Sequence, residues 1–273
     1  MEKIIKTQEQ YKNKKRKEEI IMKKLSQKQL DAILKSHSRW LRMNTCGTQA
    51  DLSYCDLGGL DLSHRNLKQI NLEGANLKYA NLSFSNLSLS NLAEANLTKA
   101  LMFNTIIKGA MLDGAILIEV VASKADFSVS SMKKCKLDHA IFTEGFLEKA
   151  HLDGSNVDHV DFTHAILSHS SFASCHVQRC CFKEATLRQV DFSRAKILGS
   201  IIVDADCTGS DFSHTGLQKN NLRGTNFSGC MIKGMKSDQK INNLPLTSNP
   251  SSIIEFVTST LSDKVFRKKE AAR

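Results

Sequence analysis

Between Leu52 and Ile232, apolar residues recur at every fifth position without interruption. Stepping by five gives (232 − 52)/5 + 1 = 37 positions, and all of them are apolar or small and non-polar, with Ala122 and Cys207 the weakest. A helix repeats its faces every ~3.6 residues and a strand every ~2, so neither element places one residue in five inside over this distance. The spacing therefore predicts a repeat protein whose chain turns a corner every five residues.

The positions beside the central residue, which we label i, follow the same period. Position i − 2 is mostly small, as in Ala75 and Ala80, because it is expected beside the corner. Position i − 1 is Asp or Asn in ten consecutive pentads, from Asp51 to Asn96. These side chains bond to nearby backbone amides and favour turns. Each pentad is therefore predicted to be one turn with a small residue and a large apolar residue inside.

Residues 75–79 (ANLKY) and 80–84 (ANLSF) resemble the A(D/N)Lxx motif of the pentapeptide-repeat proteins. The resemblance implies an all-β solenoid, a right-handed quadrilateral β-helix with four pentads in each coil. The 37 pentads would then make about nine coils and, at a coil spacing of ~4.8 Å, a rod roughly 45 Å long. Residues twenty apart should stack, which leaves Leu77, Phe162 and Phe212 in a core that needs no metal or disulfide.

An α-helix is expected on each side of the repeat. Ser26 with Gln29, and Ser252 with Glu255, have the spacing of a capping box, and an amphipathic apolar pattern follows each pair. Since the first coil of a solenoid leaves its core open, we assign the first helix to capping, with His37 packed there. The predicted organisation is a basic N-terminal arm (1–24), a capping helix (25–47), the β-helix (48–235), a linker (236–251), and a C-terminal amphipathic helix with a basic tail (252–273).

The net charge of +10 is concentrated at the two ends of the chain. Residues 1–49 carry 13 Lys/Arg and 5 Asp/Glu, whereas residues 50–235 carry 18 and 19. The densest run is Lys12, Lys14, Lys15, Arg16 and Lys17. This run is either an arm for an anionic partner, nucleic acid or membrane, or a solvated tail. The nearly neutral repeat argues against the DNA mimicry of gyrase-protecting family members, because a mimic needs a dense negative surface.

Around residues 101–121 the outward i − 1 positions become apolar over five successive pentads. Together with neighbouring exposed positions they form a candidate partner surface: Tyr79, Phe84, Leu89, Leu101, Phe103, Ile106, Met111, Ile116, Ile118 and Val121. Exposed apolar patches commonly mark interaction sites. The other interpretation is a set of β-compatible residues on a sheet surface, covered by a terminal segment.

The sequence offers no catalytic set. It contains no G-x-S-x-G, H-E-x-x-H or P-loop motif, and no C-x-x-C pair. His139 and His159 should stack on one face, but no further ligand at a suitable spacing completes a metal site. Most of the eight cysteines fall at inward positions and suit a reducing compartment. We therefore expect no enzyme activity, no cofactor, no bound metal and no small-molecule substrate.

These observations favour a non-catalytic protein-interaction scaffold with an unidentified protein partner. A gyrase-binding DNA mimic and a rod tethered to anionic membrane or nucleic acid by residues 1–24 are the alternatives, and the C-terminal helix could form a homodimer. Neither a signal peptide nor a transmembrane segment is predicted. The expected location is the bacterial cytoplasm, or a host cell if the protein is a delivered effector.

Overall fold

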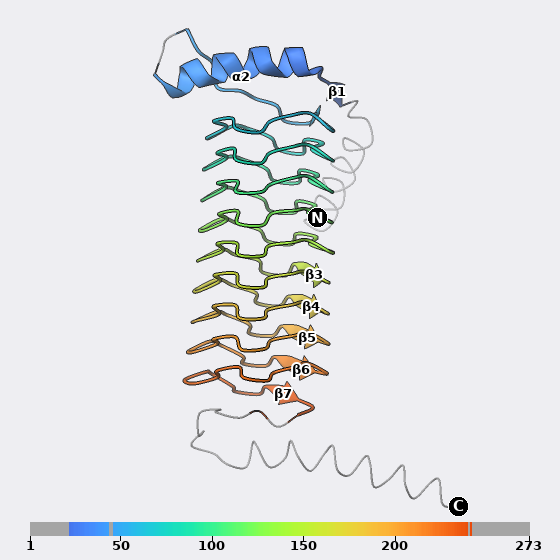
Figure 1. The fold of residues 1–273 in the computed structure, drawn as a ribbon, viewed down its shortest axis with the longest axis vertical. Coiled ribbons are helices and arrows are strands. Elements are labelled where there is room, and N and C mark those ends of the chain that lie inside the picture. Colours follow the sequence, from blue (N-terminus) through green and yellow to red (C-terminus); the bar gives the residue numbers. More distant parts are fainter. Residues whose placement is uncertain (1–21, 44–45, 240, 242–273) are drawn as a thin grey trace, which may run out of the picture.

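The computed structural model describes residues 22–43, 46–239 and 241, which form a rod of stacked coils with a helix across one end (Figure 1). Most of the predicted basic arm, most of the predicted linker and the whole predicted C-terminal helix lie outside the described residues. The short elements are β1 (Lys23–Lys24), α2 (Gln27–Leu41), β2 (Cys55–Asp56), β3 (Asn156–Asp158), β4 (His176–Gln178), β5 (Lys196–Leu198), β6 (Gly216–Gln218) and β7 (Lys236–Ser237).

Each pentad pairs with the pentad twenty residues further along the chain. Parallel bridges run from the pair Asp51–Asn71 at one end to Asp211–Met231 at the other. A repeat of twenty residues means that four pentads complete one coil, so each coil has four sides. The predicted all-β solenoid with four pentads in each coil is confirmed.

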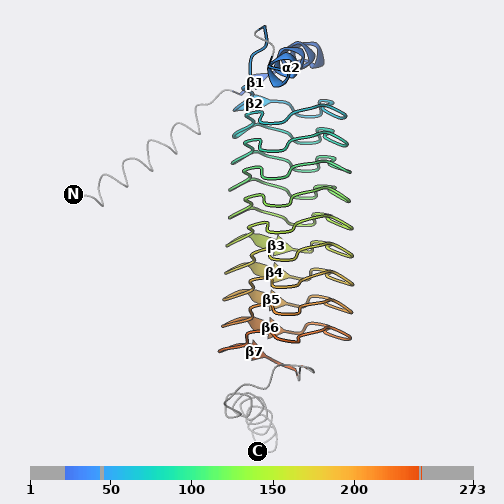
Figure 2. The ribbon, with the colours of Figure 1, turned by 90° about the vertical axis from the view of Figure 1, so that its left-hand side faces the viewer.

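The four sides of the rod are numbered here by their first pentads. Side 1 begins with the pentad of Leu52, side 2 with that of Leu57, side 3 with that of Leu62 and side 4 with that of Leu67. Every residue shares its side with the residues twenty positions before and after it. Strands β2 to β7 all lie on side 2, with β1 paired beside β2, so their labels form one column in Figure 2.

Hydrogen bonds between coils and within turns explain the five-residue period. The amide of Leu52 donates to the carbonyl of Asn71 in the next coil at 2.8 Å, and the amide of Ala75 closes its turn on the carbonyl of Leu72 at 3.0 Å. The predicted bond from the Asx side chain is present, since Asp51 Oδ1 accepts from the amide of Ser53 at 3.0 Å.

One backbone feature was not predicted from the sequence: position i + 2 adopts the left-handed conformation along the solenoid. Lys149 has φ 57° and Gly154 has φ 68°. Glycine adopts this region without strain, whereas a residue with a Cβ atom adopts it at a cost. The repeated corner of the coil therefore depends on a backbone conformation that most of its residues disfavour individually.

The core is a stack of large apolar side chains, as predicted. Leu77, Phe162 and Phe212 are at most 1% exposed. Phe162 stacks on Phe142 of the preceding coil and on Phe182 of the following coil, with ring centroids 5.4 and 5.0 Å apart. Polar residues at the small i − 2 position satisfy inward carbonyls, as where Thr105 Oγ1 donates to the carbonyl of Leu82 at 2.8 Å. Column packing and these internal bonds fill the tube.

Helix α2 covers the first coil and supplies its missing hydrogen bonds. Ser26 and Gln29 form the predicted capping box, and the helix covers Gln27–Leu41 of the predicted capping segment 25–47. Gln27 Nε2 donates to the carbonyl of Asp61 at 2.9 Å, while Gln27 Oε1 accepts from the amide of Asp61 at 2.9 Å. The helix thus replaces the coil that would otherwise precede the first one.

Candidate protein-interaction surface

Exposed apolar side chains concentrate on sides 3 and 4, in the first half of the rod. From these side chains we define the apolar strip as Phe84, Leu101, Phe103, Ile106, Val121, Ile141 and Phe146. Apart from the half-buried Val121, their exposed fractions lie between 36% and 49%. The predicted residue Leu89 and Val129 are also exposed on side 4, at position i + 2 beside the strip. Because pentads stack directly, the strip runs along two neighbouring sides of the rod.

Two columns at position i − 1 form the body of the apolar strip. Leu101 bridges to Val121 and Val121 to Ile141 on side 3, and Ile106 lies two coils from Phe146 on side 4. Asp126 interrupts the second column between Ile106 and Phe146. In these positions earlier coils carry Asp or Asn, whose side chains bond the turn. The apolar residues give up that local bond and present their side chains to the outside.

An aromatic cluster forms one end of the apolar strip. Phe84 packs edge-on against Phe103, with ring centroids 5.5 Å apart, and stacks on His64 at 4.9 Å. Such contacts hold exposed rings in fixed orientations. Below the cluster, Lys124 Nζ pairs with Glu144 Oε2 at 3.3 Å on the corner between the two sides. The strip therefore combines a rigid aromatic end with aliphatic columns beside a compensated charge pair.

The structure does not bring all ten predicted surface residues together. Tyr79, Ile116 and Ile118 belong to side 2 and Met111 to side 1, so one flat partner cannot contact them all. Sequence reasoning missed Ile141 and Phe146, because it followed one consecutive coil around the rod. The twenty-residue spacing from Leu101 to Ile141 was the signal that could have found them.

Histidines and cysteines form no chemical centre among the residues that the structure describes. The rings of His139 and His159 stack as predicted, with centroids 4.6 Å apart. No group of three or more His, Cys, Asp or Glu that could hold a metal ion occurs in this part of the chain. Burial raises the pKa of the Cys135, Cys175 and Cys180 thiols to about 12. These thiols stay protonated near neutral pH and act as small apolar fillers.

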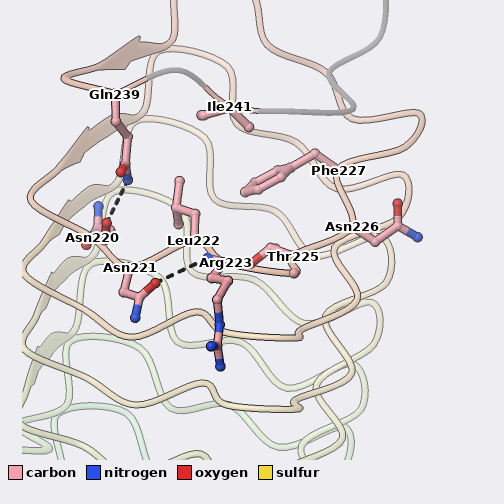
Figure 3. Close-up of a pocket in the computed structure, with 10 residues that line it drawn as sticks. Asn220, Asn221, Leu222, Arg223, Thr225, Asn226, Phe227, Gln239 and Ile241 are labelled. Carbon is pink, nitrogen blue, oxygen red and sulfur yellow. Dashed lines mark hydrogen bonds between the residues drawn. The ribbon is translucent and has the colours of Figure 1, made fainter.

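A cavity of about 600 Å³ lies at the end of the rod opposite α2 (Figure 3). Leu222, Phe227 and Ile241 line its apolar part, and Gln239 Nε2 donates to the carbonyl of Asn220 at 2.7 Å across one edge. This cavity is the open end of the tube, where the last described coil has no following coil. The chain continues into residues 242–273, so we do not assign a ligand to it.

None of the described helices is long and apolar enough to cross a membrane.

Comparison with protein families identifies the repeat. The family model for the pentapeptide repeat region matches residues 125–202, and the model for pentapeptide repeats (8 copies) matches residues 55–92, 86–117 and 191–229. Together these matches span more than half of the chain. The chain belongs to the pentapeptide repeat family. A comparison with curated proteins found no match.

Several solved pentapeptide repeat proteins are similar to this chain in fold. One is HetL of the cyanobacterium Nostoc sp. strain PCC 7120, involved in heterocyst differentiation regulation, at 20% identity and a TM-score of 0.35 over 75% of this chain and 98% of HetL. Full-length QnrB1, a plasmid-mediated fluoroquinolone resistance protein, matches at 17% identity and a TM-score of 0.35, over 70% of this chain and 93% of its own. A thylakoid-lumen pentapeptide repeat protein of Arabidopsis thaliana matches at 23% identity and a TM-score of 0.24, over 33% and 63%.

Proposed function

We propose that this pentapeptide repeat protein is a non-catalytic scaffold that binds another protein through the apolar strip. The observation that carries the proposal is the exposure of Phe84, Leu101, Ile106 and Phe146 on two adjacent sides of the rod. Contiguous exposed apolar surface is costly in water and marks interaction sites in soluble proteins. A rod of about nine coils would hold this surface in a fixed register.

The strip has the mixture of residues that protein partners use. Aromatic rings such as Phe84 and Phe103 give large contact area for little loss of conformational freedom, and they are enriched at the centres of interfaces. Around them lie polar residues and compensated ion pairs, which suit a rim. The partner would therefore present an apolar surface that fits the edge between sides 3 and 4.

Charge placement gives no support to the gyrase-directed alternative. Opposite charges follow one another in single columns, as where Lys99 pairs with Glu119 at 3.4 Å and Lys124 with Glu144 at 3.3 Å. A DNA mimic needs like charges at the spacing of phosphates. The scaffold proposal is compatible with a protein that acts in a bacterial cytoplasm or in a host cell as a delivered effector.

The test compares substitutions at matched positions inside and outside the apolar strip. The double variant Ile106→Lys, Phe146→Lys places two charges in the strip. The control Ile201→Lys, Met231→Lys changes two residues at the same i − 1 position, 45% and 54% exposed. Ile201 lies three coils beyond Ile141 on side 3, and Met231 lies on side 1. Affinity capture from the native cells would be quantified for wild type and both variants, with circular dichroism to check the fold.

We expect the strip variant to lose a partner that wild type and the control retain, by at least about tenfold, because a buried unpaired charge at an interface costs several kcal/mol. Retention of every partner by a folded strip variant would refute the proposal. Equal loss in both variants would show that added charge alone, rather than this surface, is responsible.

A further inference from the structure

The half of side 2 that contains β3 to β7 gathers basic and imidazole side chains. They are Lys136, His139, His159, His176, Arg179, Lys196, Lys219 and Lys236, all of them exposed. Three carboxylates share this surface: Asp138, Asp158 and Asp238. The corresponding stretch of side 3 has the opposite balance: two cations, Lys183 and Arg223, one imidazole, His164, and four carboxylates, Glu144, Asp161, Glu184 and Asp204. The near-neutral total charge of the solenoid thus conceals a segregation by side.

None of the four lysines on this surface forms an ion pair with another described residue. Arg179 Nη2 pairs with Asp158 Oδ2 at 2.7 Å, which neutralises that one cation. None of the ion pairs among the described residues engages Lys136, Lys196, Lys219 or Lys236. Asp238 accepts instead from the backbone amide of Lys219, at 2.8 Å. Four ammonium groups therefore remain for an external anion.

The parallel sheet arranges these groups in straight columns. Lys136, Asn156, His176, Lys196, Gly216 and Lys236 are successive partners in register, one in each coil. At a coil spacing of ~4.8 Å, the column from Lys136 to Lys236 is about 24 Å long. A second column at position i + 2 carries His139, His159, Arg179 and Lys219.

The N-terminal end of the described chain joins the rod on this same side. Strand β1 pairs in parallel with β2, which places exposed Lys23 and Lys24 at the head of side 2 (Figure 2). Residues 1–21, which precede it and lie outside the described residues, contain the run of cations from Lys12 to Lys17. The described chain therefore enters the rod on side 2, through exposed Lys23 and Lys24.

We propose that side 2 is a docking surface for an anionic membrane, on which the rod lies lengthwise. Both columns of side 2 can approach a plane of lipid headgroups at once, and lysines near an anionic leaflet contribute about 1 kcal/mol each. A nucleic-acid duplex has a convex surface, so it would contact side 2 only along a narrow line and could not engage both columns equally. Tyr79 is the one Phe, Tyr or Trp among the described outward positions of side 2, and the exposed rings of His139 and His159 already stack on each other. Side 2 therefore has no column of large aromatic side chains on which unpaired bases could stack.

Membrane docking through side 2 leaves the apolar strip accessible. The strip occupies sides 3 and 4, and side 4 is opposite side 2 in a four-sided coil. The rod would then hold a protein partner on the side away from the bilayer. The membrane proposal rests on charges that the scaffold proposal does not use, so either can fail alone.

The test is sedimentation of the full-length protein with vesicles of phosphatidylserine and phosphatidylcholine, and with vesicles of phosphatidylcholine alone. The side 2 variant is Lys196→Glu, Lys219→Glu, Lys236→Glu. The matched control, Lys68→Glu, Lys108→Glu, Lys149→Glu, makes the same change in net charge with three exposed lysines of side 4. Both variants keep residues 1–24, so the contribution of the arm is constant. Circular dichroism would verify that both are folded.

We expect wild type to bind the anionic vesicles only, the side 2 variant to bind at least about tenfold more weakly, and the side 4 control to stay within about twofold of wild type. Equal weakening in both variants would overturn the proposal, because the arm and net charge would then suffice. Absence of binding to anionic vesicles would also overturn it. Side-dependent binding to a 20-base-pair DNA duplex, without vesicle binding, would replace the membrane by nucleic acid.

Discussion

His37 provides a sharp test of how α2 closes the rod. Its side chain is fully buried and bridges two backbone groups: Nδ1 accepts from the amide of Ala50 at 3.1 Å, and Nε2 donates to the carbonyl of Lys68 at 3.1 Å. Both bonds require the neutral ring, because a protonated Nδ1 would face an N–H group. The substitution His37→Ala removes both partners at once.

The expected loss follows from the two groups left behind. A buried amide or carbonyl without a partner costs ~1–3 kcal/mol, so His37→Ala should lower the free energy of unfolding of the cap by about 2–5 kcal/mol. His37→Gln should lose less, since an amide can both donate and accept. The control His169→Asn, on the exposed surface, should change it by less than ~0.5 kcal/mol.

The same contact makes the cap sensitive to acid. Burial lowers the pKa of His37 below its ordinary value of 6.5. Above pH 6.5 the ring is neutral in both folded and unfolded chains, so the full stability is present. Below pH 6.5 the unfolded chain takes up a proton that the folded cap resists, and stability falls until the pH reaches the lowered folded pKa.

Trp40 is a local reporter for this experiment. It is the single tryptophan of the chain, and its ring lies 5.5 Å from that of His37. Urea unfolding followed by Trp40 fluorescence at pH 7.5 and 5.5 would be compared between wild type and His37→Gln. The difference between the two proteins in the pH dependence of their unfolding free energy is the contribution of His37. Equal pH dependence in the two proteins, or an unchanged stability of His37→Ala, would refute the reasoning.

Two further predictions concern the core. Phe162→Ala should lower the free energy of unfolding by about 3–5 kcal/mol, because the ring is buried between two stacked neighbours. Phe146→Ala on the surface should lower it by less than about 1 kcal/mol. Urea titration followed by circular dichroism measures both values, and similar losses would contradict the assigned core. Cys135 and Cys180 should resist a thiol reagent at pH 8 until urea unfolds the rod, since burial raises the pKa of each thiol to about 12. Mass spectrometry of labelled peptides measures the reaction, and labelling of either cysteine in the native protein would contradict this prediction.

The five-residue period was sufficient to predict the solenoid and its interior. Few backbone arrangements bury an apolar residue at every fifth position of a long segment. Leu77, Phe162 and Phe212 are buried as expected. The capping box at Ser26 was likewise readable, because it depends on residues three positions apart. Local spacing determines local hydrogen bonds, so both predictions needed no knowledge of distant contacts.

The surfaces were less predictable, because they combine residues from different coils. The prediction followed sequence order and grouped Leu101 with Met111. The structure puts Met111 on another side and brings Ile141 into the column of Leu101. The left-handed backbone at i + 2 was also missed, although ten glycines at that position have positive φ. The backbone conformation at i + 2 depends on closure of the whole coil rather than on the preference of the residue itself.

The sequence by itself determined the repeat, the identity of the core residues and the position of the capping helix, because each follows from spacing along the chain. The structure itself shows four pentads in each coil, which the sequence indicated only through the family resemblance. This number decides which outward residues gather on one side: the apolar strip on sides 3 and 4, and the lysine columns on side 2. The reason is that side chains twenty residues apart become neighbours when the coils stack. The amino-acid composition gives only the total charge and the total apolar content of the chain, whereas the folded coil distributes the side chains over four separate sides.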